Sequence, residues 1–127
     1  MENELSDITT LTDANFAAEV TAFPGVVMID YWAEWCGPCH AMAPVVSELA
    51  KKYAGNPMVK IAKLNIEENP DETAKSGVLS IPNFKFFTEG SIKDPRADQV
   101  VGVSPVEELE AVLDRLLATL PKTKPAA

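Results

Sequence analysis

The feature that most constrains the fold is an apolar run followed at once by a helical pattern that begins with two cysteines. Residues 26–33 are almost all apolar, β-branched or aromatic, with only Asp30 as an interruption. Such a run predicts a central strand covered on both faces. From Gly37 to about Tyr53 the apolar residues instead recur at helical spacing. The sequence therefore predicts a strand that leads directly into a helix.

The same alternation of extended and helical patterns continues along the chain. Strands are predicted at 8–11, 26–33, 58–66, 83–88 and 99–103, and helices at 37–53, 70–75 and 105–120, with one more helix that Thr12 or Asp13 caps and Pro24-Gly25 ends. The last two strands are joined by a short connection and must be antiparallel. We therefore expect an α/β protein with a central mixed β-sheet flanked by helices, in the order βαβαβαββα.

The length predicts one domain. A chain of 127 residues is long enough to bury one substantial core. We assign residues 1–120 to this domain. Residues 121–127 are small, polar and rich in proline, so we expect a flexible C-terminal tail without a structural role.

Charge and hydropathy exclude several classes of partner. Acidic residues outnumber basic ones by 19 to 11, the net charge is −8, and Lys and Arg form no cluster. Neither nucleic acid nor a membrane is therefore an expected partner. No apolar run approaches the roughly 20 residues of a membrane helix, and residues 1–7 are acidic where a secretory signal is basic and then apolar. We expect a cytoplasmic location.

The two cysteines carry the chemistry that the sequence predicts. In Trp35-Cys36-Gly37-Pro38-Cys39 they stand three residues apart at a helix start, where β-carbons lie about 5–6 Å apart and a disulfide requires little adjustment. Unpaired N–H groups and the positive end of the helix dipole favour a thiolate at Cys36. We expect an exposed, nucleophilic Cys36 and a shielded, resolving Cys39.

Two other uses of the cysteines are disfavoured. A structural zinc site needs four ligands, whereas this chain adds only His40, which adjoins Cys39 and is poorly placed to share a metal with both sulfurs. We therefore predict no metal. An inert buried pair is also disfavoured, because Gly37-Pro38 forms a turn that brings the sulfurs together and Trp35 indicates an exposed aromatic surface.

Five short segments carry a family resemblance: residues 30–39, 43–44, 63–65, 81–82 and 101–102. They resemble the thioredoxin family, and the match spans about residues 8–120. The resemblance implies a thioredoxin fold and protein-disulfide reductase activity through a mixed disulfide. It further implies disulfide-containing protein substrates and an electron donor of the thioredoxin-reductase type. We expect no cofactor and a monomer.

The resemblance assigns a proton-transfer role to one buried carboxylate. Asp30 matches the family's buried acid, and in an apolar strand its desolvation should raise its pKa toward neutrality, so that it exchanges protons with Cys39. The alternative is an aspartate at a strand end held by backbone hydrogen bonds. Lys63 matches the lysine that tunes this carboxylate, although a solvent-facing lysine on a strand is ordinary.

The resemblance also implies a substrate surface around Cys36. Ile81-Pro82 matches the family's cis-proline, which leaves the backbone of the preceding residue free to pair with an extended substrate. This surface would comprise Trp35, Gly77, Ile81, Pro82 and Gly102. Gly102 would let a substrate backbone approach closely. The ordinary alternative for both glycines is turn geometry.

Several positions depart from the family pattern. Leu79-Ser80 stands where a basic residue and glycine are common, and Asn83 where threonine is usual. Residues 93–98 lengthen the last hairpin. His40 replaces a lysine or arginine; its imidazole would either tune the Cys36 sulfur with pH or be a solvated surface group.

Two alternative functions remain. An oxidase or isomerase would use the same fold, but Gly37-Pro38 and the lack of a signal peptide argue against it. A non-catalytic adaptor or chaperone module would use the rim for binding, but the presence of both cysteines disfavours it.

Overall fold

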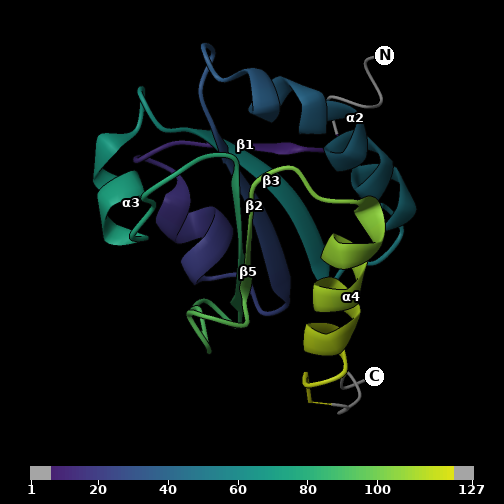
Figure 1. Cartoon of the computed structure of the whole chain (residues 1–127). Helices are drawn as coiled ribbons and strands as arrows, with labels where there is room; N and C mark the ends of the chain where they lie inside the picture. Colours follow the sequence, from purple (N-terminus) through teal and green to yellow (C-terminus); the bar gives the residue numbers. More distant parts are fainter. Residues whose placement is uncertain (1–6, 122–127) are drawn as a thin grey trace.

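The computed structural model describes residues 7–121, whose strands form one mixed five-stranded sheet (Figure 1). The strands are β1 (Thr9–Leu11), β2 (Val26–Trp32), β3 (Val59–Asn65), β4 (Asn83–Thr88) and β5 (Gln99–Val101), in the spatial order β1-β3-β2-β4-β5. β3 is parallel to both β1 and β2, whereas β4 is antiparallel to β2 and to β5. The predicted mixed sheet and its antiparallel last pair are confirmed.

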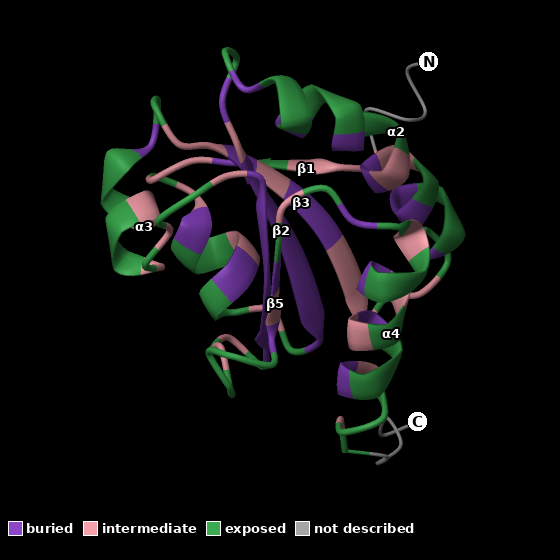
Figure 2. Cartoon of the chain, in the orientation of Figure 1, coloured by how far each residue is buried: buried purple, intermediate pink, exposed green. Residues whose placement is uncertain are grey.

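Helices cover both faces of this sheet. They are the single-turn π-helix η1 (Ala17–Thr21), α2 (Gly37–Lys52), α3 (Pro70–Lys75) and α4 (Val106–Leu117). One apolar cluster joins α2 and α4 to one face, with Met28, Met42 and Leu113 among its members. The other face packs against Phe16 and Val20 at η1, with α3 on the same side. Figure 2 shows the buried residues gathered along the strands and the inner helix faces.

The segment after β1 differs from its prediction. It forms η1 rather than a longer amphipathic helix. Thr12 and Asn15 form two reciprocal hydrogen bonds. Thr12 Oγ1 accepts the Asn15 N–H at 3.1 Å, and Asn15 Oδ1 accepts the Thr12 N–H at 2.7 Å. The carboxylate of Asp13 instead accepts the N–H groups of Asp71 and Glu72 at the start of α3, at 3.3 and 2.9 Å. The prediction that Asp13 caps the helix after β1 is therefore wrong.

The path from β2 into α2 is the part of the fold that positions the site. β2 lies between β3 and β4, and its residues from Val26 to Tyr31 are all buried. A short turn then leads to Cys36, the N-cap of α2. Strand and helix thus meet at the cysteines, as predicted. The predicted tail lies, from residue 122 onward, outside the described residues, and the boundary at 120 stays a prediction.

Candidate active site

The two cysteines are joined by a disulfide at the start of α2. Cys36 is the N-cap residue and Cys39 lies in the first turn, with 5.3 Å between their α-carbons. This separation falls within the usual range for disulfides. The structure is therefore the oxidised form of the pair, and the spacing of the two residues allows the bond as predicted.

The helix start favours negative charge on the sulfur of Cys36. Cys36 Sγ accepts the backbone N–H of Cys39 at 3.1 Å, which is an N-cap hydrogen bond. Gly37 and the imino acid Pro38 follow as the first helical residues. The positive end of the helix dipole also lies here. In the reduced form these interactions stabilise a thiolate at Cys36.

Burial does not distinguish the two sulfurs in this oxidised form. Cys36 and Cys39 are each 4% exposed, whereas the neighbouring Trp35 is 65% exposed. The prediction of an exposed Cys36 beside a shielded Cys39 is wrong here, because the sulfurs are bonded to each other and Ile66 and Ile81 pack against the pair. The difference between the cysteines lies in their helix positions.

Asp30 is a buried carboxylate inside β2. It is 4% exposed, and its Oδ1 has no hydrogen-bond partner among the described residues. Burial raises the pKa of Asp30 to about 7, while the positive charge of Lys63 acts in the opposite direction. Asp30 lies in the interior of the strand, so the alternative of a strand-end aspartate fails. By strand alternation it shares its sheet face with Met28, which packs against α2.

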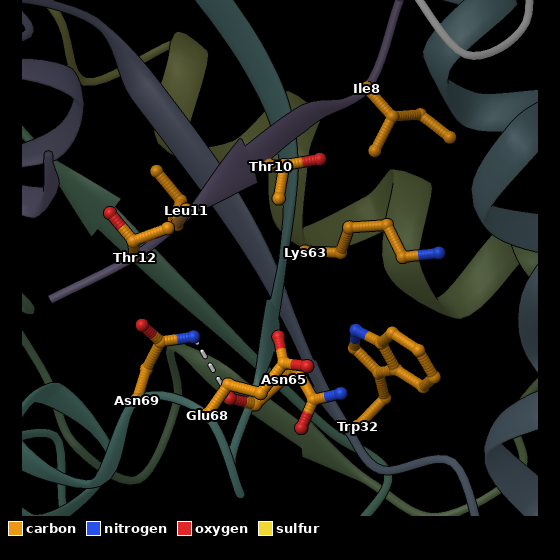
Figure 3. A pocket seen from close by; sticks show the side chains of 9 residues that line it. All are labelled: Ile8, Thr10, Leu11, Thr12, Trp32, Lys63, Asn65, Glu68 and Asn69. Carbon is orange, nitrogen blue, oxygen red and sulfur yellow. Dashed lines mark hydrogen bonds between the residues drawn. The ribbon is translucent and has the colours of Figure 1, made fainter.

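Lys63 lies on β3 beside Asp30 in the strand register. Its Nζ lies 4.8 Å from the centre of the Trp32 ring, and within residues 7–121 no ion pair joins it to a carboxylate. The side chains of Lys63 and Trp32 line a pocket of about 390 Å³ beside β1, with Thr10, Asn65 and the five further residues labelled in Figure 3. Lys63 therefore acts on Asp30 as a nearby charge and not through a salt bridge.

Two of the five predicted rim residues adjoin the pair directly: Trp35 precedes Cys36, and Ile81 packs against the disulfide. The Ile81–Pro82 peptide bond is cis. Within the part of the chain that is described, no hydrogen bond uses the backbone of Ile81, which packs against the disulfide. The N–H of Gly102 donates to the Pro82 carbonyl at 2.8 Å. With its φ of +92° and open space around its α-carbon, Gly102 leaves an uncovered stretch of backbone beside Pro82.

The remaining predicted rim residue, Gly77, ends a helix. Its φ of +72° and its position just after α3 are those of a helix-ending glycine, which supports the turn-geometry alternative; a place for Gly77 in the substrate surface stays a prediction. A groove of about 290 Å³ lies beside Trp35 and is lined by Trp35, Ile66, Val78, Leu79, Ser80 and Ile81. Sequence reasoning missed Ile66 and Val78.

Two further contacts define the surface near the cysteines. The indole Nε1 of Trp35 donates to Glu67 Oε2 at 2.6 Å, a contact between residues far apart in the sequence that no motif signalled. His40 Nε2 donates to the Glu34 carbonyl at 2.7 Å, and its ring meets Trp32 edge to face. His40 is exposed and held by these contacts, which favours the surface-residue interpretation.

Neither a metal cluster nor a membrane helix occurs among residues 7–121. No group of three or more His, Cys, Asp or Glu side chains there is placed to hold a metal ion. None of the helices in that range has the length and apolar character needed to cross a bilayer.

Comparison with known proteins decides the family. The family model Thioredoxin matches residues 7–115. The chain belongs to the thioredoxin family. A thioredoxin from Pseudomonas aeruginosa is 43% identical over 107 residues, which are 84% of this chain and 94% of that protein. Thioredoxins from Alicyclobacillus acidocaldarius and Staphylococcus aureus are each 44% identical; the matches cover 85% and 87% of this chain and 96% and 98% of those proteins.

Family and geometry together establish the type of reaction. A thioredoxin-family chain with Cys36 and Cys39 in a disulfide at a helix start is a protein thiol–disulfide oxidoreductase with disulfide-reductase activity. Its fold is the thioredoxin fold, as the resemblance implied.

Proposed function

We propose that this thioredoxin-family chain reduces protein disulfides with Cys36 as the attacking sulfur and Cys39 as the resolving one. The observation that carries this assignment is the N-cap hydrogen bond: Cys36 Sγ accepts the Cys39 N–H at the positive end of α2. A thiolate is the reactive form in disulfide exchange, so the sulfur with the stabilised negative charge attacks first.

The reaction consists of two exchanges at sulfur. The Cys36 thiolate attacks one sulfur of the substrate disulfide, forms a mixed disulfide and releases the other substrate sulfur as a thiolate. The Cys39 thiolate then attacks the Cys36 sulfur, which closes the Cys36–Cys39 disulfide and releases the second substrate sulfur. The substrate gains a pair of electrons, and the enzyme is left in the oxidised form described above.

In the second exchange, Asp30 accepts the proton of the Cys39 thiol. Its pKa of about 7 lets the carboxylate both take and return a proton near neutral pH. Asp30 shares the sheet face that packs against α2, the helix that carries Cys39. Lys63 tunes Asp30 because its positive charge lowers the carboxyl pKa.

The substrate docks as an extended segment beside Ile81. The backbone of Ile81 is free of hydrogen bonds within residues 7–121, so it is available to pair with another strand. Side chains of the substrate meet the groove formed by Trp35, Leu79 and their neighbours. Pro82 and Gly102, which are hydrogen-bonded to each other, border this track.

The oxidised pair needs an electron donor for the next cycle. A donor of the thioredoxin-reductase type is part of the proposal, as are a cytoplasmic location and a monomeric state. All three rest on the membership of the thioredoxin family.

The reduction potential of the Cys36–Cys39 couple tests the direction of the reaction. Equilibration with glutathione buffers, with both redox states separated by mass, gives this potential. A value more reducing than about −200 mV supports a reductase, whereas a value near about −120 mV is that of a dedicated oxidase. A Cys36→Ser protein that retains full biological effect would instead favour the binding-module alternative.

A further inference from the structure

A second pocket lies away from the cysteines, on the sheet face that carries η1 and α3. It has a volume of about 400 Å³ and is bordered by η1, α3, β4 and the segment 90–98 that joins β4 to β5. Phe16, Phe87, Ile92 and Pro95 form its apolar walls, and the side chain of Lys85 lines it from β4. It shares no lining residue with the groove beside Trp35.

Lys85 is a buried cation without a countercharge. Its residue is 6% exposed, its Nζ donates to Gln99 Oε1 at 2.8 Å, and burial lowers its pKa. Within residues 7–121 no carboxylate lies within ion-pair distance of this ammonium. The Lys85 ammonium has several N–H donors, and Gln99 accepts only one of them. A buried charge is costly unless it is paired, so Lys85 has unfilled capacity for an anion.

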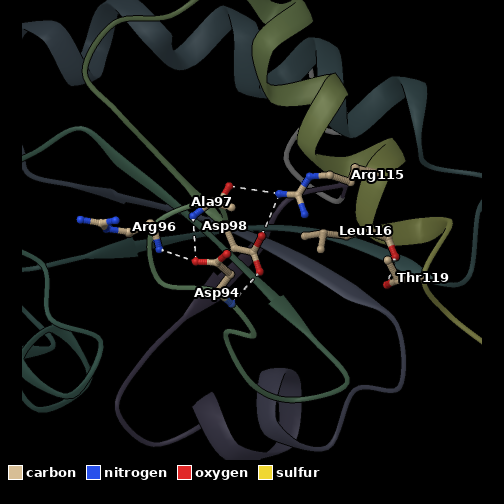
Figure 4. Close-up of polar contacts among 7 residues, drawn as sticks. All are labelled: Asp94, Arg96, Ala97, Asp98, Arg115, Leu116 and Thr119. Atoms are coloured by element: carbon tan, nitrogen blue, oxygen red, sulfur yellow. Dashed lines mark hydrogen bonds and ion pairs between the residues drawn. The ribbon is translucent and has the colours of Figure 1, made fainter.

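The acidic side chains of the pocket are already engaged. Glu72 lies 3.7 Å from Lys75 in an ion pair. Asp98 is buried; its carboxylate pairs with Arg115 at 2.8 Å and accepts the Asp94 N–H at 3.1 Å (Figure 4). The charge that remains unbalanced inside the pocket is that of Lys85.

The pocket wall that comes from the long hairpin is held in place. Asp94 Oδ1 accepts the N–H groups of Arg96 and Ala97 at 3.0 and 3.2 Å, and the Asp94 carbonyl accepts the Asp98 N–H at 2.8 Å (Figure 4). The Asp98–Arg115 pair then ties this turn to α4. Residues 93–98, which lengthen the hairpin relative to the family pattern, therefore form a fixed wall.

We propose that this pocket binds a small monocarboxylate with an apolar body. The carboxylate pairs with the Nζ of Lys85, and the apolar body packs between Phe16, Phe87 and Ile92. The pocket shares no lining residue with the groove beside the cysteines. Binding here is therefore a function separate from disulfide exchange.

Titration of the full oxidised chain with 3-phenylpropanoate, followed by amide chemical shifts in NMR, tests this proposal. We expect saturable shifts at Lys85, Ser91 and Ile92, and binding at least about tenfold weaker for the uncharged 3-phenylpropanamide. Lys85→Met should weaken carboxylate binding by about tenfold or more, because a charge-assisted hydrogen bond is lost. Lys93→Met is the matched control: it removes a lysine from the same hairpin but not from the pocket lining, and should retain wild-type affinity.

A second variant tests the pocket without replacing Lys85, whose loss could also disturb the fold. Ser91→Trp places a bulky side chain at the pocket lining, leaves Lys85 unchanged and should also abolish binding. Three results would overturn the proposal: no saturable shift at the pocket, equal binding of carboxylate and amide, or unchanged affinity in both Lys85→Met and Ser91→Trp.

Discussion

Titration of Asp30 should make the free energy of unfolding depend on pH in a defined direction. The folded pKa is about 7, compared with an ordinary value of 3.8. Between these values the folded protein holds a proton that the unfolded chain has released, so stability falls as pH rises, by about 1.4 kcal/mol for each pH unit. The full loss is about 4 kcal/mol. This loss of stability is absent at pH values below the pKa of Asp30 in the unfolded chain and complete at pH values above its pKa in the folded protein.

Asp30→Asn isolates this contribution because the amide has nearly the same shape but does not titrate. The stability of the variant relative to wild type should therefore rise by about 3–4 kcal/mol between pH 4 and about pH 8 and level off above that. A buried amide without full hydrogen bonding costs about 1–3 kcal/mol at every pH, so the pH dependence, and not the absolute gain, identifies Asp30.

Denaturant unfolding of the oxidised proteins, followed by circular dichroism from pH 4 to 8.5, measures this difference. Glu34→Gln, which removes one exposed carboxylate, serves as the control for net charge. A stability difference between Asp30→Asn and wild type that is flat across this range would refute the assignment of Asp30 as a buried acid with a raised pKa.

Three other substitutions test the scaffold and the rim. Asp98→Ala should lower the free energy of unfolding by about 2–3 kcal/mol, because it leaves the half-exposed Arg115 without its buried partner, and denaturant unfolding measures the loss. Gly25→Ala should lower the Tm by about 10 °C or more, since the new β-carbon would overlap the Met58 carbonyl; an unchanged Tm contradicts the packing described. Trp35→Ala should raise the KM for a protein disulfide about tenfold with unchanged stability, because the removed side chain is an exposed part of the rim.

The central part of the fold follows from local patterns that tertiary packing reinforces. The β2 run is apolar because both of its faces are covered, and helical spacing begins where Cys36 caps α2. Both patterns lie in consecutive residues and can therefore be recognised in the sequence. β5 ends at Val101 and α4 at Leu117, earlier than the predicted ends at 103 and 120. These ends depend on strand pairing and packing that no local pattern encodes.

Predictions were wrong or incomplete where a long-range contact decides the outcome. Asp13 has the residue type of an N-cap, but its partners are the first turn of α3, far along the chain. The near-complete burial of Cys36 depends on side chains that fold over the disulfide, such as Ile66 and Ile81. The positive φ of Gly77 belongs to the end of α3, a local role that the family motif did not indicate.

Trapping of the mixed disulfide tests the central claim, that Cys36 attacks and Cys39 resolves. Reduced Cys39→Ser and Cys36→Ser proteins are each incubated with insulin as the disulfide substrate, and the adducts are located by mass spectrometry after alkylation of free thiols. We predict a stable adduct on Cys36 in the Cys39→Ser protein and little adduct in the Cys36→Ser protein. Accumulation of the adduct on Cys39 in the Cys36→Ser protein, with none in the Cys39→Ser protein, would contradict the account.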